Sequence, residues 1–371
     1  MSEQNRKLRK RGAARDIVGK VTLLCVSTVL CLLLLEFVVR ALFPFFNPKA
    51  QIPFYATDEN FFLGPISRTV RQSTPKGDYD VLVSFNQFGF RDTKDLRRSD
   101  PEDIFVVGDS FSLGWGVEER ERYSNLLEEK LRRRVFNISI SEDLRGYARL
   151  VHYSERCGAT IRNLIIGVCM ENDLRDYSDG KTSVELFRDQ KHPGISSALG
   201  ERVRAWCWSH SALYIGASYT LQRNATIRGW MEHVGLARNI DQLTARAIPS
   251  EQVLASSRDE LVQLAKGYRA LIVIIPSRAL WSGDNRERER EVHDRFVQLL
   301  RQDGLDIVDL RPVFEQNPNP LDFYFKTDPH WNPTGHARAA KEIAEHIQNV
   351  GMSGPRPAAE SIQVGRAGSG P

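Results

Sequence analysis

The sequence has few cysteines, and their spacing suits neither a disulfide framework nor a metal site. Two of the five, Cys25 and Cys31, lie in a long apolar stretch, and the others are Cys157, Cys169 and Cys207. No two have the close spacing of zinc ligands, and Cys169 falls in an apolar run typical of a small buried side chain. We therefore expect neither a disulfide-rich domain nor a zinc protein; the sequence leaves open one disulfide among the last three cysteines.

Net charge is also small for a chain of this length. The formal charge is +4 over 371 residues, and the composition, 41% hydrophobic and 26% charged, is that of a globular protein. The net positive charge is concentrated before residue 16, where six Lys and Arg residues stand against one Glu, and no basic stripe follows. This pattern argues against a nucleic-acid partner.

What the sequence does have is a long apolar run directly after the basic N-terminus. It extends from Ile17 to Phe43, more than the roughly 20 residues that a helix needs to cross a bilayer. The basic flank predicts a cytoplasmic N-terminus and a periplasmic remainder. No small-residue cleavage site follows, which favours an uncleaved inner-membrane anchor over a signal peptide. Glu36 and Arg40 are spaced to pair on one helix face, or to contact a partner helix.

Composition divides the chain into segments. These are a basic N-terminus at 1–16, the anchor at 17–43, a linker and strap at 44–101 that includes Asn86–Asp92, a main domain at 102–350 with an insertion at about 177–250, and a Gly/Pro-rich tail at 351–371. The tail is expected to be disordered. Tryptophans in the insertion, among them Trp206 and Trp208, fit a stacking platform for sugars, a packed core or a membrane-facing surface.

Apolar strands alternate with amphipathic helices in the main domain. Strands are predicted at 104–107, 135–138, 164–168, 270–275 and 306–310, and the first helices at 118–134 and 147–157. Such alternation predicts parallel pairing with right-handed crossovers. The expected fold class is α/β: a three-layer α/β/α sandwich with a parallel sheet of about five strands, preceded by one transmembrane helix.

Polar residues follow several of these strands. Ser110 comes after the first, Asn172 after the third, and Asp328 with His330 after the fifth. In an open parallel sheet the carboxyl ends of the strands share one edge, where ligands bind. A serine hydroxyl becomes a nucleophile when an imidazole takes its proton and a third group orients the ring, so this edge has the residues needed for acyl transfer. Asp109 fits a turn residue better than the orienting acid, and His336 fits a packing residue of the last helix.

These blocks resemble those of the SGNH/GDSL hydrolase superfamily, particularly its bacterial membrane-anchored members. Residues 108–114 resemble the nucleophile block, 171–174 the asparagine block and 328–336 the acid and base block. The resemblance covers roughly residues 17–349 and implies a flavodoxin-like SGNH fold.

The resemblance also implies roles for individual residues. Ser110 is the expected nucleophile, His330 the general base and Asp328 the residue that orients it. The expected oxyanion hole consists of the Ser110 and Gly146 backbone N–H groups and the Asn172 side-chain amide. Extra residues between Asn137 and Gly146 depart from the family pattern, which makes Gly146 the weakest of these assignments.

The function expected from these features is that of a membrane-anchored serine esterase without metal or organic cofactor. It would remove O-acyl groups, chiefly O-acetyl, from an envelope glycan or related ester through an acyl-serine intermediate. One alternative is an O-acetyltransferase that modifies an extracytoplasmic polysaccharide; another is a non-catalytic glycan-binding or assembly component. The expected partners are the acylated carbohydrate and the lipid bilayer, and the sequence names no protein partner.

Overall fold

A computed structural model describes most of the chain. The described residues are 3–48, 52–74, 77–189, 203, 206, 207, 209–222, 226, 227 and 248–352. They divide into an anchor unit, Met1–Ala50 with His192–Ile240, and a sheet unit, Gln51–Lys191 with Asp241–Pro371. The predicted disordered tail, apart from residues 351 and 352, and much of the predicted insertion lie outside the described residues.

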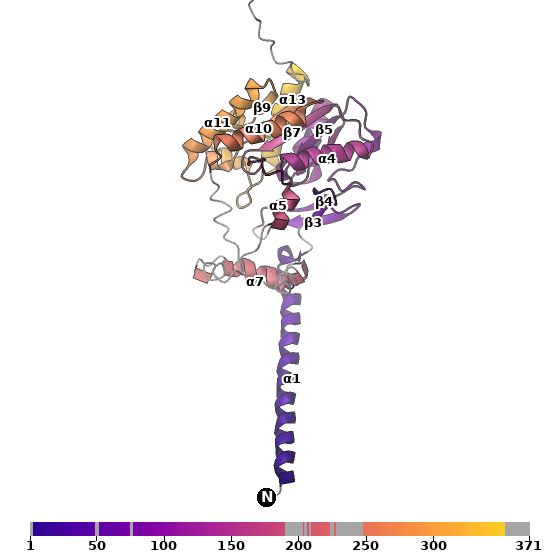
Figure 1. The fold of residues 1–371 in the computed structure, drawn as a ribbon, viewed down its shortest axis with the longest axis vertical. Coiled ribbons are helices and arrows are strands. Elements are labelled where there is room, and N and C mark those ends of the chain that lie inside the picture. The colour runs from indigo at the N-terminus through magenta and orange to yellow at the C-terminus, as the bar shows by residue number, and fades with distance from the viewer. Residues whose placement is uncertain are drawn as a thin grey trace, which may run out of the picture. The chain divides into compact units, whose positions relative to one another are not determined.

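The anchor unit is built on one long helix. Helix α1 spans Glu3–Leu42, and its segment Ile17–Leu42 is long and apolar enough to cross a membrane by length and composition. This finding confirms the predicted N-terminal apolar helix. The short 3-10 helix η1 (Pro44–Phe46) follows, and helix α7 (Ala212–Gln222) crosses the C-terminal end of α1 (Figure 1).

Five parallel strands form the sheet of the sheet unit. They are β5 (Ile104–Gly108), β6 (Val135–Asn137), β7 (Asn163–Cys169), β8 (Arg269–Ile275) and β9 (Asp306–Asp309). Their order in the sheet is β6-β5-β7-β8-β9. The chain therefore moves from β5 outward to β6, returns past β5 to β7, and continues to β9. The carboxyl ends of β5 and β7 flank the point where the direction reverses, which is where ligands bind in folds of this kind.

Helices cover both faces of this sheet. Those of the unit are α2 (Ser110–Leu113), α3 (Tyr123–Leu131), α4 (Leu144–Arg156), α5 (Ser183–Asp189), α10 (Glu251–Ala265), α11 (Arg286–Gln302), α12 (Arg311–Phe314) and α13 (Pro333–Val350), with 3-10 turns η3 (Leu96–Arg98), η4 (Glu119–Glu121), η5 (Arg278–Leu280) and η6 (Pro320–Phe323). Alternate residues of the strands pack against α4, α10 and α11 on one face, and against α3 and α13 on the other. The predicted three-layer sandwich is confirmed.

Two helix boundaries differ from the prediction. The segment expected as one helix over 118–134 is the turn η4 followed by α3, which ends where Arg132 takes a left-handed backbone with φ 53°. Helix α4 begins at Leu144, earlier than the predicted 147, because the Asp143 carboxylate caps its first turn. The earlier start places Gly146 inside the helix.

A pair of glycines lets α2 lie directly on the sheet. Gly108 at the end of β5 pairs in register with Gly167 of β7. A Cβ at either position would lie 2.3 Å from the Ser112 hydroxyl oxygen of α2. Only glycine at both positions lets the helix that begins at Ser110 approach this closely.

Two small antiparallel pairs precede the sheet, in the predicted strap. They are β1 (Tyr55–Ala56) with β2 (Phe62–Leu63), and β3 (Thr69–Ser73) with β4 (Asp80–Ser84). After β4, the fully buried Arg91 donates through Nη2 to the Val117 carbonyl at 2.6 Å, and through Nη1 to the Gly114 carbonyl. The strap is thereby fixed to the loop that follows α2.

Candidate functional site

Ser110 lies at the junction between β5 and α2. The Asp109 side chain accepts a hydrogen bond from the Phe111 N–H at 2.9 Å and so caps the helix. Ser110 is the first residue of α2, and the N–H groups of a first helical turn have no acceptor within the helix. Its side chain therefore stands at the sheet edge beside an uncommitted backbone donor.

The loop before α13 brings His330 and Asp328 to this edge. The Asp328 carboxylate accepts the His330 backbone N–H at 3.0 Å and contacts the ring Nδ1 at 2.6 Å. The opposite ring nitrogen, Nε2, lies 2.7 Å from the Ser110 hydroxyl oxygen. The structure thus places these three predicted residues in one hydrogen-bonded chain, although 220 positions separate Ser110 from His330.

The pKa values of two carboxylates near His330 are shifted in opposite directions. For Asp328, burial alone would raise the pKa, but the hydrogen bonds from His330 and Tyr79 together hold it below its usual value. Burial raises the pKa of Asp109, opposed by the charge of His330 and the Phe111 N–H. Asp328 is thus the residue that stays ionised against the imidazole, while Asp109 caps α2, in line with the sequence interpretation.

Sequence reasoning missed two residues that touch this group. The Tyr79 hydroxyl, in the segment before β4, donates to Asp328 Oδ2 at 3.0 Å and accepts from the Trp115 indole N–H at 2.7 Å. Burial and the Asp328 carboxylate raise the pKa of Tyr79, so the hydroxyl keeps its proton. The Trp115 ring stacks on the His330 ring, with centroids 5.4 Å apart and planes 25° apart. No sequence signal links Tyr79 to a residue 249 positions away.

Asn172 reaches the same edge from the end of β7. One of its side-chain N–H groups donates to Asp109 Oδ2 at 3.0 Å. The turn that carries it is held by Asp173, whose carboxylate accepts the Cys169 backbone N–H at 2.7 Å and the Tyr147 hydroxyl at 2.9 Å. Because an amide nitrogen carries two hydrogens, Asn172 has a second donor besides the one bonded to Asp109, the residue before Ser110.

Gly146 is not brought to this group. Its backbone N–H donates to the Asp143 carboxylate at 3.1 Å, within the first turn of α4. The Glu142 side chain covers it so closely that a Cβ would lie 2.4 Å from Oε2. The expected Gly146 oxyanion donor is therefore corrected: the longer loop after β6 lets Asp143 cap the helix and take this N–H.

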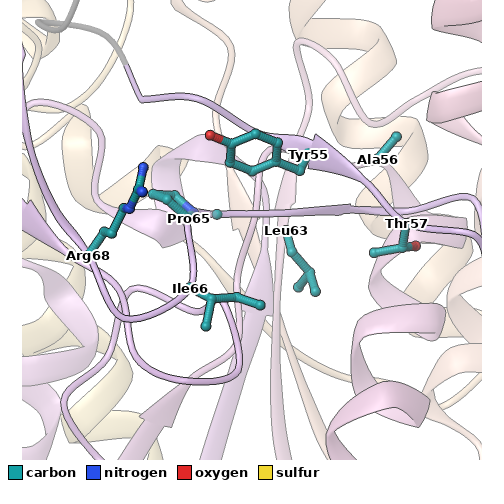
Figure 2. Close-up of a pocket in the computed structure, with 8 residues that line it drawn as sticks. Tyr55, Ala56, Thr57, Leu63, Pro65, Ile66 and Arg68 are labelled. Atoms are coloured by element: carbon teal, nitrogen blue, oxygen red, sulfur yellow. The ribbon is translucent and has the colours of Figure 1, made fainter.

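Two further features of the described residues bear on ligand binding. Within those ranges no group of three His, Cys, Asp or Glu side chains is placed to hold a metal ion. A surface pocket of about 430 Å³ lies in the strap, lined by residues from Tyr55 to Arg68 (Figure 2). None of its lining residues belongs to the group of Ser110, His330 and Asp328.

Comparison with known proteins finds a family match in the C-terminal part of the chain. Residues 236–367, which contain Asp328 and His330, match the family described as the SGNH hydrolase-like domain of acetyltransferase AlgX. The alginate biosynthesis protein AlgX of Pseudomonas aeruginosa is 32% identical over 107 residues, which are 26% of this chain and 22% of that protein. The chain thus matches only about a fifth of the length of that relative.

The similarity to solved structures is weaker, both in sequence identity and in TM-score. A lipase/acylhydrolase of Enterococcus faecalis is 12% identical, with a TM-score of 0.39 over 69% of this chain and 100% of that one. A putative lipolytic protein of the G-D-S-L family from Desulfitobacterium hafniense is 8% identical, with a TM-score of 0.37 over 66% and 98%. Because both scores are below 0.5, the fold assignment rests on the strand order and the family match. The β6-β5-β7-β8-β9 sheet and the match over 236–367 together support the SGNH hydrolase superfamily as the family of this chain.

Proposed function

We propose that this protein is a membrane-anchored acyl-transfer enzyme that acts on O-acyl groups of carbohydrates through an acyl-Ser110 intermediate. The observation that carries the proposal is the chain of contacts from Ser110 Oγ to His330 Nε2 at 2.7 Å and from His330 Nδ1 to Asp328 at 2.6 Å. These are the distances that a general base and its orienting carboxylate need.

The first half-reaction forms the acyl-enzyme. His330 Nε2 takes the hydroxyl proton as Ser110 Oγ attacks the ester carbonyl carbon, and a tetrahedral oxyanion forms. The Ser110 N–H and the second amide hydrogen of Asn172 are the donors for this oxyanion. Collapse breaks the bond to the alcohol oxygen, which leaves with the proton from His330, and the acyl group stays on Ser110.

The second half-reaction depends on the acceptor. His330 removes a proton from an incoming hydroxyl, whose oxygen attacks the acyl carbon and releases Ser110 Oγ, which takes the proton back. Water as acceptor makes the protein an esterase, whereas a sugar hydroxyl makes it an acyltransferase. The serine, histidine and carboxylate supply all the proton transfers, so this mechanism needs no cofactor.

O-Acetyl groups on a polysaccharide are the substrate that the relatives favour. The matching family is described by its acetyltransferase, and the relative in Pseudomonas aeruginosa by alginate biosynthesis. This supports the O-acetyltransferase as a second candidate beside the esterase. A purely non-catalytic role is disfavoured, since a scaffold has no need of the Ser110–His330–Asp328 geometry.

The proposed location is the cytoplasmic membrane, with the sheet unit outside. The apolar segment Ile17–Leu42 supports a single membrane-spanning anchor. The basic residues before it support a cytoplasmic N-terminus.

The experiment that separates the two candidates measures both products. Full-length protein in detergent is given p-nitrophenyl acetate with and without a polysaccharide acceptor, and free acetate and acetylated glycan are quantified. Acetate release that Ser110→Ala abolishes supports the esterase; acetyl-glycan formation that the same variant abolishes supports the transferase. Equal activity in wild type and Ser110→Ala would contradict both.

A further inference from the structure

Helix α7 is docked on the end of α1 by a charged pair. Arg40 Nε contacts the Glu36 carboxylate at 2.6 Å, and Arg40 Nη2 donates to the His210 carbonyl at 2.5 Å. Glu36 in turn accepts the Ala212 and Leu213 backbone N–H groups, each at 2.9 Å. The structure thus has the predicted pairing of Glu36 with Arg40 within α1, and Glu36 also caps the N-terminus of α7, a helix of the same chain.

A further contact fixes α7 beside the residues that follow α1. The Glu36 carboxylate accepts the Ser211 hydroxyl at 2.8 Å. On the next turns, Gly216 faces the Phe46 ring of η1, where a Cβ would lie 2.9 Å from a ring carbon. Helix α7 is therefore held at two points and crosses the end of α1 (Figure 1).

The polar residues of α1 place this junction at a definite depth. At about 1.5 Å per residue, Lys20 and Arg40 are separated by about 30 Å along the axis, which equals the hydrocarbon thickness of a bilayer. If α1 spans the membrane, Arg40 lies at its outer boundary and Glu36 about one turn inside it. A carboxylate at that depth needs partners, and the α7 N-terminus supplies them.

The composition of α7 suits that depth. Its sequence ALYIGASYTLQ contains no charged residue, a composition typical of a helix buried in protein or lipid. Within the described part of the chain, Leu221 is 42% exposed and Trp206, just before the helix, 61% exposed. Exposed tryptophan beside a membrane-spanning helix is typical of the interface between headgroups and acyl chains.

We infer that α7, with Trp206, lies in the outer interface of the bilayer that α1 crosses, docked there by Glu36. The inference rests on the proposed membrane anchor and commits to lipid as the occupant of the exposed α7 surface. It favours the membrane-facing interpretation of the insertion's aromatic residues over a sugar platform. Its consequence is that the chain contacts the membrane twice, through a span and through a surface helix.

Photo-crosslinking in vesicles tests this placement. Benzoylphenylalanine replaces Leu221 of α7, Leu30 of the span or Leu82 of β4, side chains that are 42%, 61% and 59% exposed, respectively. Full-length protein is reconstituted in vesicles of phosphatidylethanolamine and phosphatidylglycerol that contain a fluorescent phosphatidylethanolamine, and labelled protein is measured after irradiation. We expect position 221 to be labelled at least about tenfold above position 82, and position 30 also to be labelled.

The other outcomes distinguish a wrong placement of α7 from a wrong assignment of the membrane anchor. Label at position 30, with position 221 no higher than position 82 or crosslinked to a second chain, would overturn the inference and leave the anchor standing. No label at position 30 would overturn the anchor, and the inference with it. Glu36→Ala should lower the label at position 221 severalfold and leave position 30 unchanged; equal labelling at 221 would contradict the docking role of Glu36.

Discussion

Tyr79 donates a hydrogen bond to Asp328, 249 positions away in the sequence, at 3.0 Å. The same hydroxyl accepts from Trp115, whose ring stacks on His330. The strap therefore contributes directly to the surroundings of the proposed acid and base pair. We regard Tyr79 as a positioning residue, because it acts on the reaction through Asp328.

Tyr79→Phe is expected to lower kcat/KM for p-nitrophenyl acetate about tenfold, the order of magnitude of a lost hydrogen bond to a charged group. Without this donor the pKa of Asp328 rises, and the carboxylate binds the imidazolium proton more tightly. The acidic limb of the kcat/KM profile should therefore move to higher pH.

Tyr153→Phe is the matched control. The Tyr153 hydroxyl donates to the Phe88 carbonyl at 3.3 Å, in the same unit. It should leave the pH profile in place. A Tyr79→Phe profile that coincides with that of Tyr153→Phe would show that Tyr79 has a structural role only.

Asn172→Ala tests the proposed oxyanion donor. Loss of one such donor is expected to lower kcat on the order of 10²-fold with KM little changed, since the bond strengthens only as charge develops on the oxygen. Steady-state kinetics on p-nitrophenyl acetate measure both constants. An unchanged kcat would remove Asn172 from the oxyanion hole.

Gly146→Ala tests whether the Gly146 N–H, which the sequence suggested as an oxyanion donor, contributes to the reaction as Asn172 is expected to. An added Cβ meets the Glu142 side chain, so the variant should unfold at lower temperature. Its folded fraction should keep the wild-type kcat, because the Gly146 N–H is bonded to Asp143. A kcat loss as large as that of Asn172→Ala, in folded protein, would restore Gly146 as a donor.

Glu142 should make stability depend on pH. Burial raises its pKa from 4.5 to about 7, against the lowering effect of hydrogen bonds from Ser183 and the Phe62 N–H. The folded state thus holds this proton more tightly than the unfolded chain. Below pH 4.5 the protonated Glu142 adds its full contribution to the free energy of unfolding, on the order of 3 kcal/mol. This contribution is lost as the pH rises toward 7.

Glu142→Gln keeps the side chain neutral at every pH. Thermal unfolding of full-length protein in detergent should show that the variant gains stability relative to wild type between pH 4.5 and 7. Glu291→Gln, on an exposed position of α11, should show no such gain. Parallel pH curves for wild type and Glu142→Gln would contradict the raised pKa.

The sequence was sufficient to predict the fold and to point to Ser110, His330 and Asp328, which the structure brings together, because both depend on local patterns. The run before Ser110 is apolar and buried as predicted, and Asp328 and His330 are two positions apart, so one turn brings them together. Their convergence on Ser110 follows from parallel strands whose carboxyl ends share an edge.

What the sequence did not reveal depends on contacts between distant segments or on helix boundaries. Tyr79 reaches Asp328 only because the strap folds against the loop before α13. The Gly146 assignment failed because Asp143 caps α4; an aspartate just before an apolar helical pattern is a start signal that could have placed the boundary correctly. The docking of α7 on Glu36 joins segments about 175 positions apart.

The most direct test of the account is covalent labelling of Ser110. Full-length wild type, Ser110→Ala and His330→Ala in detergent are treated with a fluorophosphonate, and the adduct is located by tandem mass spectrometry. The account predicts an adduct on Ser110 in wild type, none at position 110 in Ser110→Ala, and a labelling rate lower by on the order of 10²-fold or more in His330→Ala. Folded wild type without an adduct on Ser110, or equal labelling in His330→Ala, would contradict it.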